Sequence, residues 1–171
     1  MKCLNIRLHL VGENNAAVGL SLNNLGKLYF EMGNLNKAEK FNLKSLQVNQ
    51  YLFGENYPIV AMTLNNLGNL YYKLEDHGAA EEFYLRSLKI RQKLYGENHF
   101  TVAESLMNLG SLYMSMGDLM QAEEFYLQSL KIYINILGEN HLTVANSFNN
   151  LGTLYCIMEN LDLAEEYKLF E

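Results

Sequence analysis

Asparagine side chains recur at a fixed spacing along the chain and are the polar groups best placed to bind a ligand. The set repeats every 42 residues and consists of Asn24, Asn66, Asn108 and Asn150, with Asn23, Asn65 and Asn149 directly before three of them. A carboxamide both donates and accepts hydrogen bonds, so a row of them can hold the backbone of an extended peptide whatever its sequence. The same amides could instead bond to neighbouring helices or to backbone, and both roles are compatible because one amide has four bonding sites.

Histidine residues form no metal-binding pattern. His99 and His141 lie 42 residues apart, whereas metal sites need ligands that converge at short spacings such as Cys-x-x-Cys. We therefore predict no metal site and expect these two side chains to form local hydrogen bonds within loops.

The other candidates for chemistry are pairs of adjacent glutamates, Glu81 and Glu82, Glu123 and Glu124, and Glu165 and Glu166. Acid–base catalysis needs two carboxylates in environments that separate their pKa values. Neighbours that point to different sides of one helix do not provide this, and they more simply favour the positive end of the helix dipole. No nucleophile-elbow, phosphate-loop or dinucleotide motif occurs, so the sequence predicts no enzyme activity and no cofactor.

These residues belong to a chain with a strict internal period. The motif Leu-Asn-Asn-Leu-Gly begins at Leu22 and Leu64, and close variants begin at Leu106 and Phe148, in steps of 42 residues. A fixed period of this size predicts a solenoid built from one supersecondary unit. We therefore divide a single array into the end of a preceding second helix (1–10), repeat 1 (12–53), repeat 2 (54–95), repeat 3 (96–137) and a truncated repeat 4 (138–171).

Each repeat is predicted to hold two helices. In repeat 2, Pro58 suits the first turn of a helix, and apolar residues spaced along one helical face continue that helix to Lys73. A turn over 75–78 then leads to a second helix over 79–94. Gly96 follows it as a C-terminal glycine.

Two positions of the first helix are predicted to pack inside the array. The tyrosines Tyr29, Tyr71, Tyr113 and Tyr155 lie on its apolar face, so we expect core packing and not a ligand-stacking row. Gly68 recurs as Gly26, Gly110 and Gly152, although glycine inside a helix costs about 1 kcal/mol relative to alanine. A repeated unfavourable residue needs a packing reason. We predict that the second helix crosses closely there, with the small residues Ala80 and Ser87 opposite.

The motif Leu64-x-x-Leu67-Gly68-x-x-Tyr71, followed by Ala80-x-x-x-Tyr84, resembles the tetratricopeptide repeat. Its 42-residue form, with Gly-Glu-Asn loops, is similar to the tetratricopeptide domain of kinesin light chains and resembles related arrays in signalling proteins. The resemblance covers the whole chain. It implies an all-α, right-handed α-solenoid superhelix of antiparallel helix pairs that acts as a non-catalytic protein-interaction scaffold.

Repeat 1 departs from this pattern. Asn42 stands where the next two repeats have Tyr84 and Tyr126. The family loop also usually contains a proline after its histidine, and Pro58 is the one proline of the chain. We expect the shorter, polar Asn42 to weaken the first interface.

The resemblance implies that the side of each first helix opposite its apolar face lines a concave groove. The peptide-binding residues that we assign to it are Asn23, Asn24, Lys27, Asn65, Asn66, Asn69, Tyr72, Lys73, Met107, Asn108, Ser111, Asn149 and Asn150. Among these, Lys27 and Lys73 alone are positively charged, too few for a clamp on a terminal carboxylate. We therefore expect a protein or peptide partner with a polar or mixed apolar segment.

The composition disfavours other partners. The chain has 13 Lys and Arg against 19 Asp and Glu, a net charge of −6, whereas nucleic-acid binding needs clustered basic residues on phosphates. There is no apolar run of about 18 residues, so no membrane span is predicted. The amino terminus lacks the apolar core and cleavage site of a signal peptide, and we expect a cytoplasmic protein.

The predicted half-helices at both ends suggest two alternative functions. Helices of about ten residues are marginal in water on their own. The array could therefore stack end to end on another copy and form a homo-oligomer. The chain could also be the sensor or regulatory module of a larger signalling protein.

Overall fold

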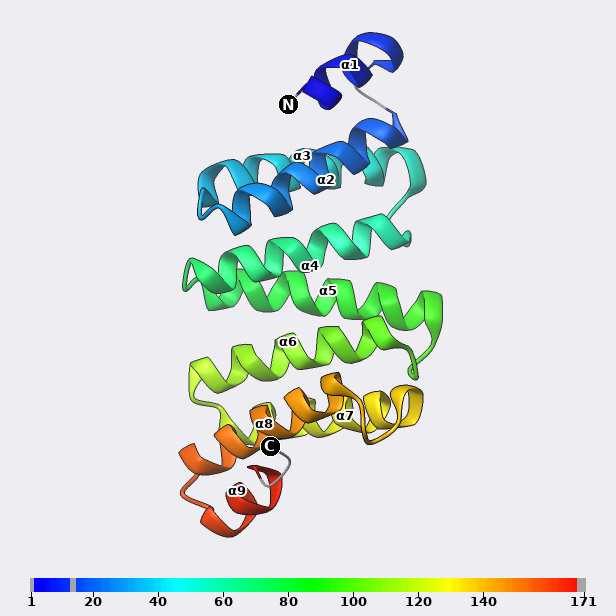
Figure 1. Cartoon of the computed structure of the whole chain (residues 1–171). Coiled ribbons are helices and arrows are strands. Elements are labelled where there is room, and N and C mark those ends of the chain that lie inside the picture. Colours follow the sequence, from blue (N-terminus) through cyan, green and yellow to red (C-terminus); the bar gives the residue numbers. More distant parts are fainter. Residues whose placement is uncertain (1, 13–14, 169–171) are drawn as a thin grey trace. The chain divides into compact units, whose positions relative to one another are not determined.

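The computed structural model describes residues 2–12 and 15–168, so residues 1, 13–14 and 169–171, which belong to the predicted first, second and last segments, lie outside the described residues. The described residues form helices and no strand, which confirms the predicted all-α class. In chain order the helices are α1 (Lys2–Val11), α2 (Ala16–Glu31), α3 (Leu35–Phe53), α4 (Pro58–Lys73), α5 (His77–Tyr95), α6 (Phe100–Met116), α7 (Leu119–Leu137), α8 (Leu142–Ile157) and α9 (Leu161–Lys168) (Figure 1).

The helices belong to two compact units, one ending at Leu94 and the other beginning at Tyr95. In the first unit α2 packs on α1 and α3, and α4 packs on α3 and α2. In the second unit α7 packs on α6 and α8, and α8 packs on α9. Within each unit, helices that follow one another in the sequence are therefore neighbours in space, as expected for a solenoid.

The core of the first unit is organised around one face of α4. Leu64, Leu67 and Leu70 are fully buried and form one cluster with Ala38 of α3 and Ile90 of α5. Residues three apart lie on the same side of a helix, so this spacing presents a continuous apolar stripe to both second helices.

The predicted position of the tyrosine row is confirmed for Tyr29 and Tyr71, which are partly buried against this cluster. The hydroxyl of Tyr71 donates to Glu39 Oε1 at 2.6 Å. That hydrogen bond, together with burial, raises the pKa of Tyr71 to about 12. Tyr155 of the second unit makes the same bond to Glu123, at 2.7 Å. These phenols therefore join a first helix to the second helix of the preceding repeat.

The bounds of α4 match the prediction, whereas α5 begins at His77, two residues earlier than predicted. Glu75 lies in the predicted turn, whereas His77 and Gly78 already belong to α5. Glu75 has a φ of 60°, in the left-handed region that Gly33 and Gly117 occupy at the matching positions. A glutamate in this conformation is strained because its Cβ approaches the carbonyl oxygen, whereas glycine has no Cβ.

The close crossing predicted at Gly68 is confirmed, but a different residue lies opposite. A Cβ on Gly68 would collide with the ring of Tyr84, so the glycine provides the seat for an aromatic ring. The atoms nearest to that Cβ position belong to Tyr84 and not to Ala80 or Ser87, the two residues that we expected there, although both are fully buried. Sequence spacing alone did not reveal which side chain of the second helix reaches the glycine.

Candidate functional site

The predicted peptide-binding residues of the first unit lie on two helices in contact, α2 and α4. Asn23 is 3% exposed and belongs to the interior. The others keep part of their surface in solvent, and we call them the α2–α4 surface: Asn24 and Lys27 of α2, with Asn65, Asn66, Asn69, Tyr72 and Lys73 of α4.

The predicted residues of the second unit lie on α6 and α8. All retain some exposure, and we call them the α6–α8 surface: Met107, Asn108 and Ser111 of α6, with Asn149 and Asn150 of α8. A polar contact joins the two helices, because Asn150 Nδ2 lies 3.1 Å from Met107 Sδ.

The asparagine row also has a structural role. Asn66 Nδ2 donates to Asn23 Oδ1 at 3.1 Å, and Thr63 Oγ1 donates to the same oxygen at 3.1 Å. These bonds hold α4 against α2, which is the second of the two roles that the sequence left open. Asn66 is nevertheless only partly buried, and a carboxamide that uses one of its four bonding sites can still bind a ligand.

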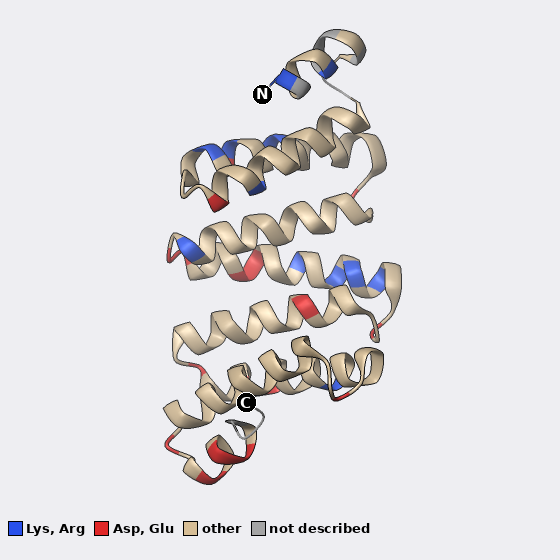
Figure 2. Cartoon of the chain, in the orientation of Figure 1, with Lys and Arg blue, Asp and Glu red and all other residues tan. Residues whose placement is uncertain are grey.

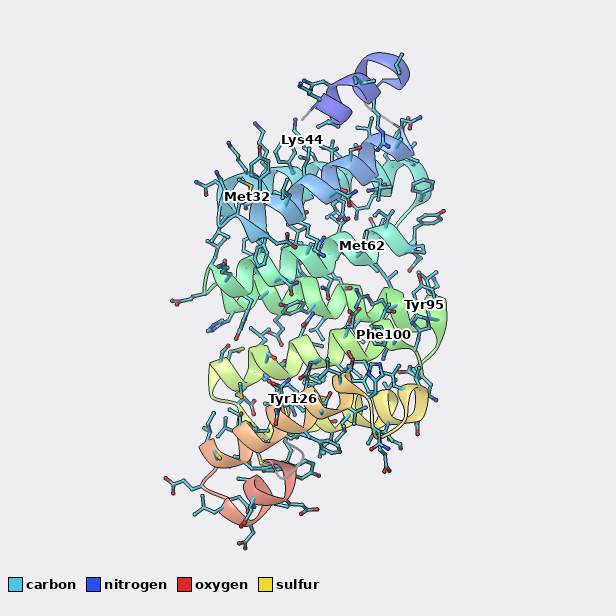
Figure 3. All side chains as sticks on the ribbon, viewed as in Figure 1. Met32, Lys44, Met62, Tyr95, Phe100 and Tyr126 are labelled. Carbon is cyan, nitrogen blue, oxygen red and sulfur yellow. The ribbon has the colours of Figure 1, made fainter. Side chains whose placement is uncertain are left out.

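Buried tyrosines of the second helices form hydrogen bonds with residues of the α2–α4 and α6–α8 surfaces. Tyr84 of α5 is 2% exposed, and its hydroxyl donates to Asn69 Oδ1 at 2.7 Å. Tyr126 of α7, labelled in Figure 3, donates in the same way to Ser111 Oγ at 3.0 Å. Burial raises the pKa of Tyr84, so the phenol stays protonated and remains a donor. Each ring thus fills the space beneath one predicted binding residue.

Asn42 of α3 occupies the matching place in the first helix pair. Its side chain is fully buried against Gly26, as the ring of Tyr84 is against Gly68. Neither Oδ1 nor Nδ2 of Asn42 has a hydrogen-bond partner among the described residues. A buried polar group without a partner costs roughly 1–3 kcal/mol. The sequence departure had suggested a weaker interface, but the unpaired amide is apparent only in the structure.

A pocket of about 120 Å³ lies beside this amide. We call it the Asn42 pocket; it is lined by Lys27, Phe30 and Glu31 of α2, Asn42 of α3, and Asn66 and Asn69 of α4. Lys27 Nζ lies 3.9 Å from a carboxylate oxygen of Glu31, and both side chains are largely exposed. The ring of Phe30 adds an apolar wall, with Lys73 Nζ 5.2 Å from its centroid. Our sequence-based site included three of these residues but not Asn42.

The first helices carry few charges. In Figure 2 the Lys and Arg residues of the first unit are most frequent on α3 and α5, whereas α4 has Lys73 alone and α8 has none. Because charged side chains are sparse, polar recognition on the α2–α4 and α6–α8 surfaces would depend mainly on amides and hydroxyls.

The histidines predicted to bond locally do so. His99 Nδ1 accepts from the Thr101 N–H at 3.2 Å, and His141 Nδ1 accepts from the Thr143 N–H at 3.1 Å. Each ring caps the helix that follows it. Within residues 2–12 and 15–168, no group of three His, Cys, Asp or Glu side chains is arranged to hold a metal ion.

This architecture defines a helical-repeat protein with polar side chains on the exposed faces of its first helices. A family model, the tetratricopeptide repeat, matches residues 16–93, 59–113 and 101–168. The chain therefore belongs to the tetratricopeptide repeat family, whose repeats generally mediate protein–protein interactions. No curated protein matches the sequence. In the part of the chain that the structure describes, no helix has the length and apolar character needed to cross a membrane.

Solved structures of similar fold include BtubC (BKLC) from P. vanneervenii, with 28% identity and a TM-score of 0.82 over 88% of this chain. This chain spans 60% of the BtubC chain. A putative kinesin light chain from Podosopora anserina aligns over 96% of this chain and 80% of its own, with 18% identity and a TM-score of 0.80. RapI aligns over 95% of this chain and 57% of its own, with 18% identity and a TM-score of 0.82.

Proposed function

We propose that the chain is a non-catalytic scaffold whose α2–α4 and α6–α8 surfaces each bind an extended segment of a partner protein. Asn66 on the α2–α4 surface and Asn108 on the α6–α8 surface would each hold the backbone of the segment bound there, since carboxamides satisfy both peptide N–H and C=O groups. Flanking side chains such as Met107 and Tyr72 would contribute selectivity.

One observation carries this proposal. Asn66 is anchored by its hydrogen bond to Asn23 and yet remains partly exposed. An amide that is already oriented by its neighbour loses little side-chain freedom when a ligand binds, which favours affinity. The few charges on α2 and α4 favour a segment with polar and apolar residues over a strongly charged one.

The proposal can be tested with a displayed library of random peptides selected on the intact chain. The affinity of a selected peptide would then be measured by fluorescence anisotropy for wild type and for Asn66→Ala combined with Asn108→Ala. Loss of the amide that holds the peptide backbone should weaken binding by about tenfold, whichever of the two surfaces the peptide occupies.

The matched control is Gln47→Ala, which removes an exposed carboxamide from the second helix α3 and should leave the affinity unchanged. Melting followed by circular dichroism separates loss of binding from loss of structure, because Asn66→Ala also removes the bond to Asn23. Unchanged affinity and unchanged melting in the double variant would refute the proposal.

Self-association is a second candidate function, favoured by apolar side chains on α1. Ile6 and Leu10 are 59% and 73% exposed, and contact with another copy would cover such residues. Light scattering over a concentration series tests this candidate directly. A monomer at every concentration would exclude it.

A further inference from the structure

We propose that the Asn42 pocket is a subsite for a side-chain carboxamide, that of an asparagine or glutamine of the bound partner segment. The inference rests on the proposed function, because it names one group of the segment that the α2–α4 surface would hold. It concerns the first helix pair alone, where Asn42 replaces the tyrosine of the later pairs.

The pocket exists because Asn42 is shorter than Tyr84 and Tyr126, which occupy the matching positions of the next two repeats. Tyr84 fills the equivalent space with its ring and donates its hydroxyl to Asn69. Asn42 packs on Gly26 in the same way, but its amide ends without a partner among the described residues. The result is a pocket lined by a buried amide with an unused donor and an unused acceptor. A ligand group could satisfy both once the lining side chains move.

The other amides of the lining also supply one donor and one acceptor. Asn69 Oδ1 is bonded to the Tyr84 hydroxyl, so its Nδ2 is the group available to donate. Asn66 Nδ2 is bonded to Asn23, so its Oδ1 is the group available to accept. A complementary ligand must therefore donate and accept at once, as a carboxamide does.

The charges of the lining favour a neutral group. Lys27 and Glu31 form an ion pair at the pocket, and their charges compensate each other. A carboxylate would face the Oδ1 atoms of Asn42 and Asn66, and an ammonium would face donors and Lys27. Each would leave a charge poorly paired in a confined site, which is costly. A carboxamide carries no such penalty, and the ring of Phe30 can cover its aliphatic stem.

The size of the pocket and its entrance are suited to such a group. The volume of about 120 Å³ corresponds to roughly four water molecules at about 30 Å³ each. Asn42 is fully buried, so side chains of the lining must move before an entering group reaches its amide. Lys27 and Glu31 are the exposed residues of that lining. Their ion pair is exposed, and exposed pairs contribute little stability.

A fragment titration tests the subsite without a known partner. The intact chain would be titrated with propionamide, propionate and propylammonium, with the side-chain amide signals of its asparagines followed by NMR. We expect propionamide to shift the Asn42 signals saturably, with a Kd of roughly 1–10 mM for so small a ligand. We expect the two charged fragments to bind at least about tenfold more weakly. No saturable shift with propionamide, or equal binding of all three, would overturn the subsite.

Two variants at one position provide the controls. Asn42→Leu removes the amide at similar size, and Asn42→Tyr fills the pocket as Tyr84 does. Both should reduce propionamide affinity at least about tenfold while melting no lower than wild type. If Asn42→Leu bound propionamide with the affinity of wild type, the unpaired amide of Asn42 would not recognise the ligand. That result would refute the inference.

The peptide library separates this inference from the proposed function. Peptides selected on wild type should carry Asn or Gln at one fixed position, and peptides selected on Asn42→Tyr should not. Peptides that bind wild type without that preference would refute the subsite alone. Failure to select any peptide would count against the proposed function, and the fragment titration would still decide the chemistry of the pocket.

Discussion

The helix pairs α2–α3 and α4–α5 share one framework and differ at the buried residue that covers a glycine of the first helix. In each pair a serine of the second helix bonds to a carbonyl of the first: Ser45 to Gly19 at 2.9 Å and Ser87 to Ala61 at 2.8 Å. In each pair a glycine of the first helix is covered by a side chain of the second. That side chain is a hydrogen-bonded tyrosine in α4–α5 and an unpaired asparagine in α2–α3.

The comparison shows that the framework does not depend on the aromatic ring. The helices α2 and α3 lie close together although the residue that covers Gly26 is not aromatic, and that residue decides whether the space above it is filled or forms a pocket. A scaffold of this kind can acquire a recognition pocket in one repeat with its helix pair unchanged, at the expense of some local stability.

The largest expected effect comes from making the second pair resemble the first. Tyr84→Asn removes a fully buried ring and its bond to Asn69, so we expect the free energy of unfolding in urea to fall by about 3–5 kcal/mol. Tyr126→Asn provides an independent test in the second unit. A loss below about 1 kcal/mol for both variants would show that the rings contribute little.

Alanine substitution of Gly68 and of Gly26 should show whether the side chain that covers each glycine can move to make room for a Cβ atom. In Gly68→Ala the new Cβ meets the ring of Tyr84, which is large and buried, so we expect a loss of about 1–3 kcal/mol. In Gly26→Ala the neighbour is the short amide of Asn42, which can turn toward the adjacent pocket. A smaller loss for Gly26→Ala supports this picture, and the reverse order of stabilities contradicts it.

Removal of the orphan amide should stabilise the first pair. Asn42→Leu replaces an unpaired buried polar group with an apolar one of similar size, and we expect the free energy of unfolding to rise by about 1–3 kcal/mol. Asn49→Leu is the matched control, because Asn49 is equally buried but donates to the Ser45 carbonyl at 2.8 Å. A gain in the control as large as that at Asn42 would argue against the role assigned to the missing partner.

The turns of the two pairs offer a smaller comparison. Glu75 has a positive φ where the first pair has Gly33, so Glu75→Gly should stabilise by about 1 kcal/mol or less through relief of backbone strain. The opposite change, Gly33→Ala, should destabilise by a similar amount. Thermal melting of the two variants checks both signs.

The remaining expected effect is a dependence of stability on alkaline pH. The pKa of Tyr71 rises from 10 to about 12 in the folded chain, so the folded state binds this proton more tightly than the unfolded state. The resulting stability is fully present below pH 10 and is lost as the pH rises toward 12. The slope of unfolding free energy against pH in this window should be shallower in Tyr71→Phe than in wild type.

Much of the fold could be predicted from the sequence because the signals are local and repeated. Pro58 and the apolar spacing that follows it predicted both ends of α4. The start of α5 was missed because all of 75–78 was assigned to the turn, whereas the helix begins at His77 and the left-handed residue that matches Gly33 is Glu75. Nothing in the composition of that segment marks a glutamate for a left-handed conformation.

The candidate site was predictable in position but not in detail. The asparagine row indicated which side of α2 and α4 carries amides, but the burial of Asn23 and its bond to Asn66 depend on the distance between two helices. The departure at Asn42 was visible in the sequence. Its unpaired amide was not, because pairing depends on whether a side chain reaches its neighbour within a fraction of an ångström.

The hydrogen bonds between helices recur at constant separations along the chain. The serine bonds join residues 26 apart at Ser45, Ser87 and Ser129, and the tyrosine bonds join residues 32 apart at Tyr71 and Tyr155. Recombination that inserts or deletes whole periods of the gene would preserve every such pair, since donor and acceptor keep their offset. Arrays of this kind can therefore change length during evolution without the loss of their internal polar contacts, and each duplicated copy is then free to diverge at the residue that covers its glycine.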